Sequence, residues 1–321
     1  MIAIFDGNHL LHRSMRVGSL ALLENRKGKA TGGFFGSIKS IHSIIGEYKI
    51  KKCFVVFDGG ISKRRRDLLP EYRGPRHRKP DDPFYVEPDE EKKEYDQKFD
   101  SQRRMLQFAL AKMGVRTLRA DGWEADDLAY LLVKRIEQDG GAINLVSDDR
   151  DWLQMVVDKR GFTVNTIRPI GEQFITYDNF EEEVGYPQDQ FLIRRAIIGE
   201  TGSDNIPGIP GVGEKTAAQI FEEGALACKF PFDEIFNFCS DHKQKRVRKI
   251  ADNIDILWRN YEVINLSYEM PTLALNQQVD ACVRSAVGVD LIAVKRFFTE
   301  LDLFSVLKEL HTWIVPFSKL R

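Results

Sequence analysis

Three aspartates of this 321-residue sequence stand at or shortly after the end of a short apolar run: Asp6, Asp58 and Asp149. Apolar runs of this length, rich in β-branched and aromatic residues, are typical of buried strands. Open α/β sheets hold their ligands outside the carboxyl ends of their strands. We therefore expect these three acids to converge at one edge of a sheet.

Further carboxylates extend this predicted cluster. The segment SDDRDW (147–152) adds an acid two residues after Asp149. The segment GWEADDLAYLL (122–132) places three acids at the start of an expected helix, and GETGSDN (199–205) contributes two more. The added acids are Asp151, Glu124, Asp126, Asp127, Glu200 and Asp204.

Several carboxylates in one cleft repel one another strongly unless they are compensated. Hard divalent cations with oxygen ligands are the usual remedy, and two such ions about 4 Å apart suit in-line hydrolysis of a phosphodiester. Each acid alone is better explained as a helix cap or a solvated side chain. Together they favour a metal-bound cluster. His9 and His12 could form a zinc pair, but their spacing is more typical of structural histidines.

The net charge of −1 hides a strong asymmetry. Residues 63–79 contain eight Lys/Arg and two acids, residues 81–100 contain nine acids and three lysines, and KQKRVRK (243–249) is basic again. Charge runs are usually solvated surface. The planar guanidinium of arginine nevertheless suits phosphate oxygens, and the ring of a tyrosine can stack on an unpaired base. The basic run close to Asp58 therefore favours nucleic-acid contact through Arg65, Tyr72, Arg73 and Arg76.

A glycine-rich turn lies in IPGIPGVGEKTA (206–217), before a helix expected to start near Glu214. Such a turn exposes backbone N–H groups that can hold a phosphate. The alternative is a plain turn between two helices. The segment lacks the Walker pattern, which argues against a nucleotide-binding P-loop.

The order of the expected elements indicates an α/β fold. Apolar runs at 2–5, 52–57 and 143–146 alternate with helical patterns over 34–48, 99–113 and 128–136. This order predicts a mainly parallel sheet flanked by helices. A hairpin is expected over 162–177, and mostly helix from about 187, interrupted at 199–213. The expected domains are a core over 1–186, with a charged insertion at about 60–98, and a helical region over 187–321.

Composition excludes several classes of protein. No apolar run approaches the roughly 20 residues of a membrane helix, and no basic region precedes the apolar residues at the N-terminus, unlike a secretory signal. The four cysteines are far apart and form no CxxC pair. Reduced thiols in a cytoplasmic protein are therefore expected.

With these motifs in order, the chain resembles the 5′-nuclease family, which includes phage flap endonucleases, ribonuclease H-type 5′-exonucleases and the N-terminal nuclease of bacterial DNA polymerase I. The resemblance covers nearly the whole chain and implies a PIN-like core, a helical arch over the insertion and a helix–three-turn–helix at about 195–222. The blocks that carry it are DGNHLLHR (6–13), VFDG (56–59), RRDLLPEYRGPR (65–76), GWEADD (122–127), DRDW (149–152) and SDNIPGIPGVGEKTA (203–217).

The resemblance implies two-metal hydrolysis of DNA, as a flap endonuclease and 5′→3′ exonuclease that also removes RNA primers. It implies two or three Mg²⁺ ions, replaceable by Mn²⁺, and K⁺ at the helix–three-turn–helix. The first metal would be held by Asp6, Asp58, Glu124, Asp126 and Asp127, and the second by Asp149, Asp151 and Asp204. Arg65 and Arg73 would steady the scissile phosphate. DNA contacts would come from Arg13, Tyr72, Arg76, Gly211, Gly213 and Lys215.

One block departs from the family pattern Gly-Asp-x-x-Asp-Asn. Here Glu200 replaces the first aspartate and lies one residue further from Asp204. Either its longer side chain reaches the second metal or Asp204 serves alone. The altered block leaves open a DNA-structure binding protein with weakened catalysis, and a PIN-type ribonuclease is a second rival.

The implied partners are DNA with 5′ flaps, nicks or 5′ ends and RNA–DNA primer duplexes. Replication proteins such as single-stranded DNA-binding protein are candidate protein partners. A monomer in the cytoplasm, or in the host cytoplasm for a phage protein, is expected.

Overall fold

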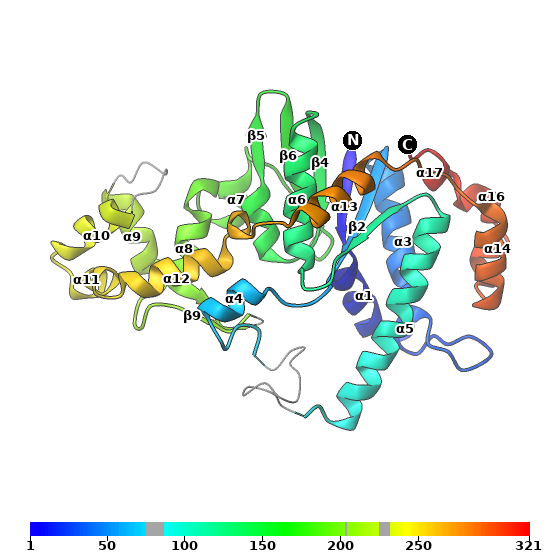
Figure 1. Ribbon diagram of the computed structural model, residues 1–321, viewed down its shortest axis with the longest axis horizontal. Helices are drawn as coiled ribbons and strands as arrows, with labels where there is room; N and C mark the ends of the chain where they lie inside the picture. Colours follow the sequence, from blue (N-terminus) through cyan, green and yellow to red (C-terminus); the bar gives the residue numbers. More distant parts are fainter. Residues whose placement is uncertain (75–86, 203, 225–231) are drawn as a thin grey trace. The chain divides into compact units, whose positions relative to one another are not determined.

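The computed structural model describes residues 1–74, 87–202, 204–224 and 232–321 (Figure 1). The chain divides into two compact units. Unit 1 comprises Met1–Gly60, Pro88–Thr176 and Pro271–Arg321, and unit 2 comprises Ile61–Glu87 and Tyr177–Met270. Within the described residues, the helices are all too short or too polar to cross a membrane.

A seven-stranded sheet forms the centre of unit 1, in the order β3-β2-β1-β4-β6-β5, with β7 paired to β6. Five strands run parallel, and β5 and β7 run antiparallel to β6. The prediction of a mainly parallel sheet is confirmed, and β6 and β7 form the expected hairpin. The strands are β1 (Ile2–Asp6), β2 (Lys52–Phe57), β3 (Arg116–Arg119), β4 (Gly141–Val146), β5 (Val157–Lys159), β6 (Phe162–Arg168) and β7 (Gln173–Ile175).

The central strands are buried on both faces, as strands of a parallel sheet usually are. Ala3 and Phe5 of β1 belong to a core cluster that includes α3 and α5, and Ile4 between them is equally buried. Helix α6 packs against β2 and β3, and α13 packs against α6 and β3. The helices of unit 1 are α1 (Gly7–Arg16), α2 (Gly18–Ala21), α3 (Gly32–Glu47), α5 (Glu90–Lys112), α6 (Ala125–Glu137), η1 (Arg150–Met155), α13 (Leu273–Arg284), α14 (Leu291–Glu300), α15 (Phe304–Leu307), α16 (Leu310–Trp313) and α17 (Val315–Ser318).

The last part of the chain does not follow the expected domain boundary at residue 186. Residues 271–321 belong to unit 1, and Val294, Phe298 and Phe317 are buried in the same core cluster as β1 and α3. An amphipathic pattern shows that a helix has an apolar face but not which surface will receive it. The helical region expected over 187–321 is therefore shared between the two units.

Unit 2 is mostly helical, as predicted from residue 187 onward. The expected interruption at 199–213 contains a two-stranded ladder of β8 (Gly199–Glu200) and β9 (Ile206–Pro207). The expected insertion contributes α4 to this unit, whereas the long helix that begins at Glu90 belongs to unit 1. The helices of unit 2 are α4 (Lys63–Leu68), α7 (Phe180–Val184), η2 (Gln188–Gln190), α8 (Phe191–Ile198), α9 (Glu214–Gly224), α10 (Phe232–Ser240), α11 (Lys245–Asp252), α12 (Ile254–Ile264) and η3 (Leu266–Tyr268).

Candidate active site

Asp6 is the last residue of β1, and Asp58 directly follows β2. These two strands are parallel neighbours in the sheet. Asp6 caps α1, and its carboxylate accepts a hydrogen bond from the backbone N–H of His9 at 2.8 Å. The Asp58 carboxylate accepts one hydrogen bond from the side-chain amide of Asn8 and one from the backbone N–H of Ala125, each at 2.7 Å. The sheet register therefore holds the two acids at the same edge, each oriented by N–H donors.

This proximity has an electrostatic cost. Burial and, to a smaller extent, the negative charge of Asp58 together raise the pKa of Asp6 to about 6, although hydrogen bonds from His9 and Ser147 act in the opposite direction. Only 6% of Asp6 is exposed. A cation placed beside these carboxylates would remove the repulsion and favour their charged forms.

The acids at the start of α6 are all buried, and the helix dipole favours negative charge at that end. Asp126 accepts a hydrogen bond from the indole N–H of Trp152 at 2.6 Å. Trp152 is itself fully buried and lies in η1, directly after the acids that follow β4. The contact ties two acidic blocks of the sequence together. The acids of this helix start are Glu124, Asp126 and Asp127.

Asp149 and Asp151 form a local turn after β4. The Asp149 carboxylate caps η1 by accepting a hydrogen bond from the backbone N–H of Asp151 at 2.9 Å. The backbone N–H of Asp149 donates to the hydroxyl of Ser147 at 3.1 Å, and that hydroxyl donates to Asp6 at 3.4 Å. Strands β1 and β4 are neighbours, so Ser147 links the acids of both strands.

These side chains fit divalent cations by the chemistry of their donors, since all are carboxylate oxygens, the ligands that Mg²⁺ and Ca²⁺ prefer. In the described residues, these carboxylates do not form a complete metal-binding site. Across residues 1–74, 87–202, 204–224 and 232–321, no three His, Cys, Asp or Glu side chains converge closely enough to hold a metal ion among them. Mg²⁺ commonly keeps several of its waters, so direct contact with every acid is not required.

The structure adds Asp148, which sequence reasoning did not single out. Its carboxylate lies 2.9 Å from Nε2 of His9 and 3.9 Å from the guanidinium of Arg13. Burial acts to lower the pKa of His9, but the hydrogen bond to Asp148 and the charges of Asp6 and the neighbouring aspartates outweigh it, so the pKa is raised. The guanidinium of Arg13 also donates to the hydroxyl of Ser40 at 2.9 Å.

Unit 2 holds Arg65 and Arg73, the two arginines predicted to steady the scissile phosphate. Arg73, at a φ of +57°, donates from Nε to the Asp204 carboxylate at 3.1 Å. Tyr72 is only 3% exposed, and the guanidinium carbons of Arg65 and Arg73 lie 6.0 and 5.6 Å from its ring centre. Because the ring is buried, Tyr72 supports the two arginines here and offers no open stacking face. Arg76 lies outside the described residues.

Arg65 is also buried, at 2% exposure, and its Nε donates to the carbonyl of Val263 at 2.8 Å. Glu200, the departure from the family pattern, forms an ion pair with Arg195 at 3.1 Å. Its carboxylate is therefore already compensated within unit 2.

The glycine turn before α9 has two positions that require glycine. At Gly208, a Cβ would lie 1.9 Å from the carbonyl oxygen of Ile198. Gly211 has a φ of +74°, and a Cβ there would lie 2.7 Å from Nζ of Lys249. Gly213 has open space around it, and Lys215 is exposed in the first turn of α9. The turn thus brings a lysine of α11 beside exposed backbone.

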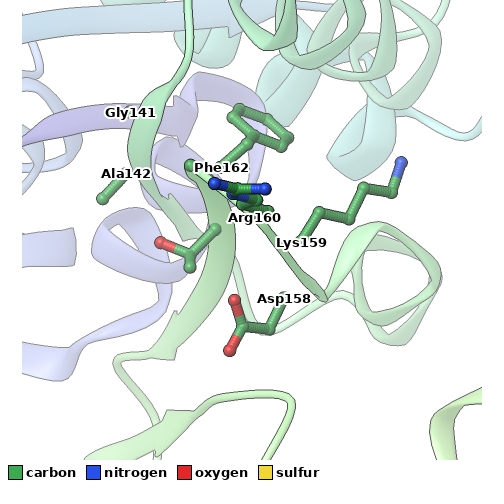
Figure 2. A pocket seen from close by; sticks show the side chains of 8 residues that line it. Gly141, Ala142, Asp158, Lys159, Arg160 and Phe162 are labelled. Carbon is green, nitrogen blue, oxygen red and sulfur yellow. The ribbon is translucent and has the colours of Figure 1, made fainter.

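An open cavity of about 670 Å³ lies at the amino ends of β4 and β6, the opposite edge of the sheet from the aspartates (Figure 2). Figure 2 shows Asp158, Lys159 and Arg160 along its rim. The ammonium of Lys159 is paired with Glu137 at 2.6 Å. This cavity does not belong to the carboxylate site.

Comparison with solved structures identifies the fold. The bacteriophage T5 flap endonuclease in a complex with DNA and metal ions superposes with a TM-score of 0.66 at 24% identity, over 96% of this chain and 99% of that chain. The catalytic core of Rad2 in complex with a DNA substrate superposes with a TM-score of 0.52 at 16% identity, over 99% of this chain and 92% of that one.

Sequence comparison identifies the family. A 5′-3′ exonuclease of Buchnera aphidicola (subspecies Acyrthosiphon pisum) is 30% identical over 288 residues, which cover 89% of this chain and 91% of the relative. The thermostable DNA polymerase I of Thermus thermophilus is 25% identical over 308 residues, and the match spans only 33% of its length. Residues 1–185 match the model of the 5′-3′ exonuclease N-terminal resolvase-like domain. The chain belongs to the 5′-3′ exonuclease family.

Proposed function

We propose that this protein is a structure-specific 5′-nuclease that hydrolyses DNA phosphodiesters with divalent metal ions, as a flap endonuclease and 5′→3′ exonuclease. The observation that carries the proposal is the placement of carboxylates at the ends of the neighbouring strands β1, β2 and β4, where burial and the charge of Asp58 raise the pKa of Asp6. Family membership supports the reaction class. T5 structures with bound metal ions, zinc among them, support the metal requirement.

The proposed metal ligands fall into two groups. When bound, the ions supply Lewis acidity that activates water and neutralises the phosphate. Mg²⁺ is the proposed ion, two or three in number, with Mn²⁺ as a substitute. The first group comprises Asp6, Asp58, Glu124, Asp126 and Asp127, and the second comprises Asp149, Asp151 and Asp204, with Glu200 as a candidate.

The basic residues have a separate task, to bind and orient the polyanion. Arg65 and Arg73 are proposed to steady the scissile phosphate, because a planar guanidinium binds phosphate oxygens in a fixed geometry. Arg13, partly exposed beside the first carboxylates, is a second phosphate contact. The glycine turn with Lys215 is proposed to hold duplex DNA, with K⁺ at the same turn.

The proposed substrates are DNA with 5′ flaps, nicks or 5′ ends, and RNA primers in RNA–DNA duplexes. The test is cleavage of end-labelled flap, nicked, gapped and RNA–DNA substrates in EDTA, Mg²⁺ and Mn²⁺. We expect cutting only with a divalent ion, fastest on substrates with a free 5′ strand. Cleavage in EDTA, or none on any 5′-ended substrate with Mg²⁺, would refute the proposal.

Asp149→Ala serves as the inactive variant in this assay. It should lower the rate of cleavage at least about 10³-fold, because it removes a proposed ligand of the second metal, while DNA binding in EDTA persists. Asp158→Ala is the matched control, since Asp158 is an exposed aspartate at the opposite edge of the sheet. An active Asp149→Ala enzyme would remove this residue from the site.

A second candidate is a DNA-structure binding protein with weakened catalysis. The ion pair between Glu200 and Arg195 favours it, because that carboxylate is already engaged. The same assay decides between the two, since a binding protein would retain flap DNA in a gel shift without cutting it in Mg²⁺.

A further inference from the structure

The carboxylate of Asp148 joins three elements of unit 1. The side chain of Asp148 is 8% exposed. One of its oxygens lies 2.9 Å from Nε2 of His9 in α1, and the other accepts a hydrogen bond at 2.8 Å from the backbone N–H of Ile170, between β6 and β7. The carbonyl of Asp148 accepts a further hydrogen bond from the guanidinium of Arg168 at 3.0 Å. The residue just before Asp149 is therefore fixed through both its side chain and its backbone.

His9 contacts two of the acidic blocks at once. Its backbone N–H donates to Asp6 at 2.8 Å, and its imidazole contacts Asp148 at 2.9 Å. Asp6 ends β1, whereas Asp148 follows β4, and these strands are neighbours in the sheet. One histidine thus contacts both the residue that caps α1 and the turn that leads into Asp149.

The Asp148 carboxylate contacts two side chains of α1, those of His9 and Arg13. An additional carboxylate next to Asp149 would add to the repulsion at the site unless a cation or donor compensated it. The imidazole of His9 and the guanidinium of Arg13 lie 2.9 and 3.9 Å from the Asp148 carboxylate. Its negative charge is thereby used to orient α1 and is not available as one more ligand oxygen.

We propose that Asp148 is a positioning residue, which acts through His9 to hold Asp149 and Asp6 at the separation that divalent cations require. The inference rests on the proposed function. It assigns a role to a pair that lies 139 positions apart in the sequence. Partners that orient metal ligands typically change metal affinity about 10- to 100-fold when they are removed.

The experiment measures Mn²⁺ affinity by isothermal titration calorimetry without DNA, so that its readout does not depend on catalysis. The variants are His9→Ala, Asp148→Ala and the double variant. His12→Ala is the matched control, because His12 lies on the same helix but stacks on Phe99 with ring centres 4.1 Å apart. Thermal unfolding of each variant shows whether it is folded at the titration temperature.

Each single variant should bind Mn²⁺ about tenfold more weakly, and the double variant should lose no more than a single one, because both act through one contact. His9→Gln and Asp148→Asn, which keep a donor and an acceptor, should restore most of the affinity and also serve if an alanine variant fails to fold. His12→Ala should bind as the wild type does.

Two results would overturn the inference while leaving the proposed function intact. One is wild-type Mn²⁺ affinity in folded His9→Ala or Asp148→Ala or, where neither alanine variant folds, a loss of about tenfold or more in both His9→Gln and Asp148→Asn. The other is a double variant whose loss equals the product of the two single losses, about 100-fold. A wild-type protein that neither binds Mn²⁺ nor cuts flap DNA would instead refute the proposed function, and the inference with it.

Discussion

At the scale of single residues, the carboxyl group of Asp6 makes the metal-free protein less stable as the pH rises. In the unfolded chain this group loses its proton near the ordinary pKa of 3.8, whereas in the folded protein it keeps the proton up to about pH 6. Between these values the folded state binds more protons than the unfolded state, so the free energy of unfolding falls with pH. A shift of this size corresponds to a loss on the order of 3 kcal/mol.

Asp6→Asn should therefore unfold at a higher urea concentration than the wild type at pH 7 in EDTA, and the difference should shrink as the pH approaches 4. The asparagine keeps an oxygen that can accept the hydrogen bond from His9, so capping of α1 is preserved. Adding Mg²⁺ at pH 7 should stabilise the wild type and not the variant. Identical pH profiles for the two metal-free proteins would contradict a buried, strained carboxyl group.

Glu200 poses a second question at this scale. We predict that Glu200→Gln, which keeps the shape and removes the charge, clearly raises the Mg²⁺ concentration needed for half-maximal cleavage. The ion pair with Arg195 gives a competing expectation, in which Glu200 serves only to compensate that arginine. In that case Glu200→Gln and Arg195→Met would lower thermal stability by similar amounts and leave the Mg²⁺ requirement unchanged.

At the scale of elements, the turn before α9 separates two glycines that look alike in the sequence. Gly211→Ala should weaken duplex binding and cost about 1 kcal/mol of stability, because alanine disfavours a positive φ and its Cβ would push against Lys249. Gly213→Ala meets open space, so it should leave stability unchanged and weaken binding only if DNA closely approaches that backbone. Fluorescence anisotropy of a labelled duplex at fixed salt measures both, and a Gly211→Ala variant with normal affinity would exclude the turn from binding.

The elements also show how far the sequence could be interpreted. The ends of β1, β2 and β4 were predictable because continuous apolar runs mark strands that are buried on both faces. Strand β3 was missed because its four residues, RTLR, offer only one large apolar side chain. The pairing of His9 with Asp148 could not be inferred, since no spacing rule relates residues that only the sheet brings together.

At the scale of the whole molecule, the last fifty or so residues complete the core of the carboxylate-bearing unit, although they were expected to belong to a separate helical region over 187–321. Phe298→Ala should destabilise the protein by roughly 3–5 kcal/mol, because Phe298 is fully buried in the cluster that includes Phe5 and Phe34. Ile292→Ala on the same helix is the control, since Ile292 is 84% exposed. Equal urea midpoints for the two variants would mean that α14 is not part of this core.

The three-part composition of unit 1 has a consequence for biosynthesis. Its core draws on residues 1–60, 88–176 and 271–321, so a ribosome must release almost the entire chain before that core can close. Until then, the apolar faces of α3 and α5 that α17 and α14 will cover stay accessible to water and to other nascent chains. Closure also joins segments far apart in sequence, a step that is slow because long loops must be ordered first. Folding of the carboxylate site is thus expected to finish after translation, and chaperones that shield apolar surface should raise the yield of the full-length chain.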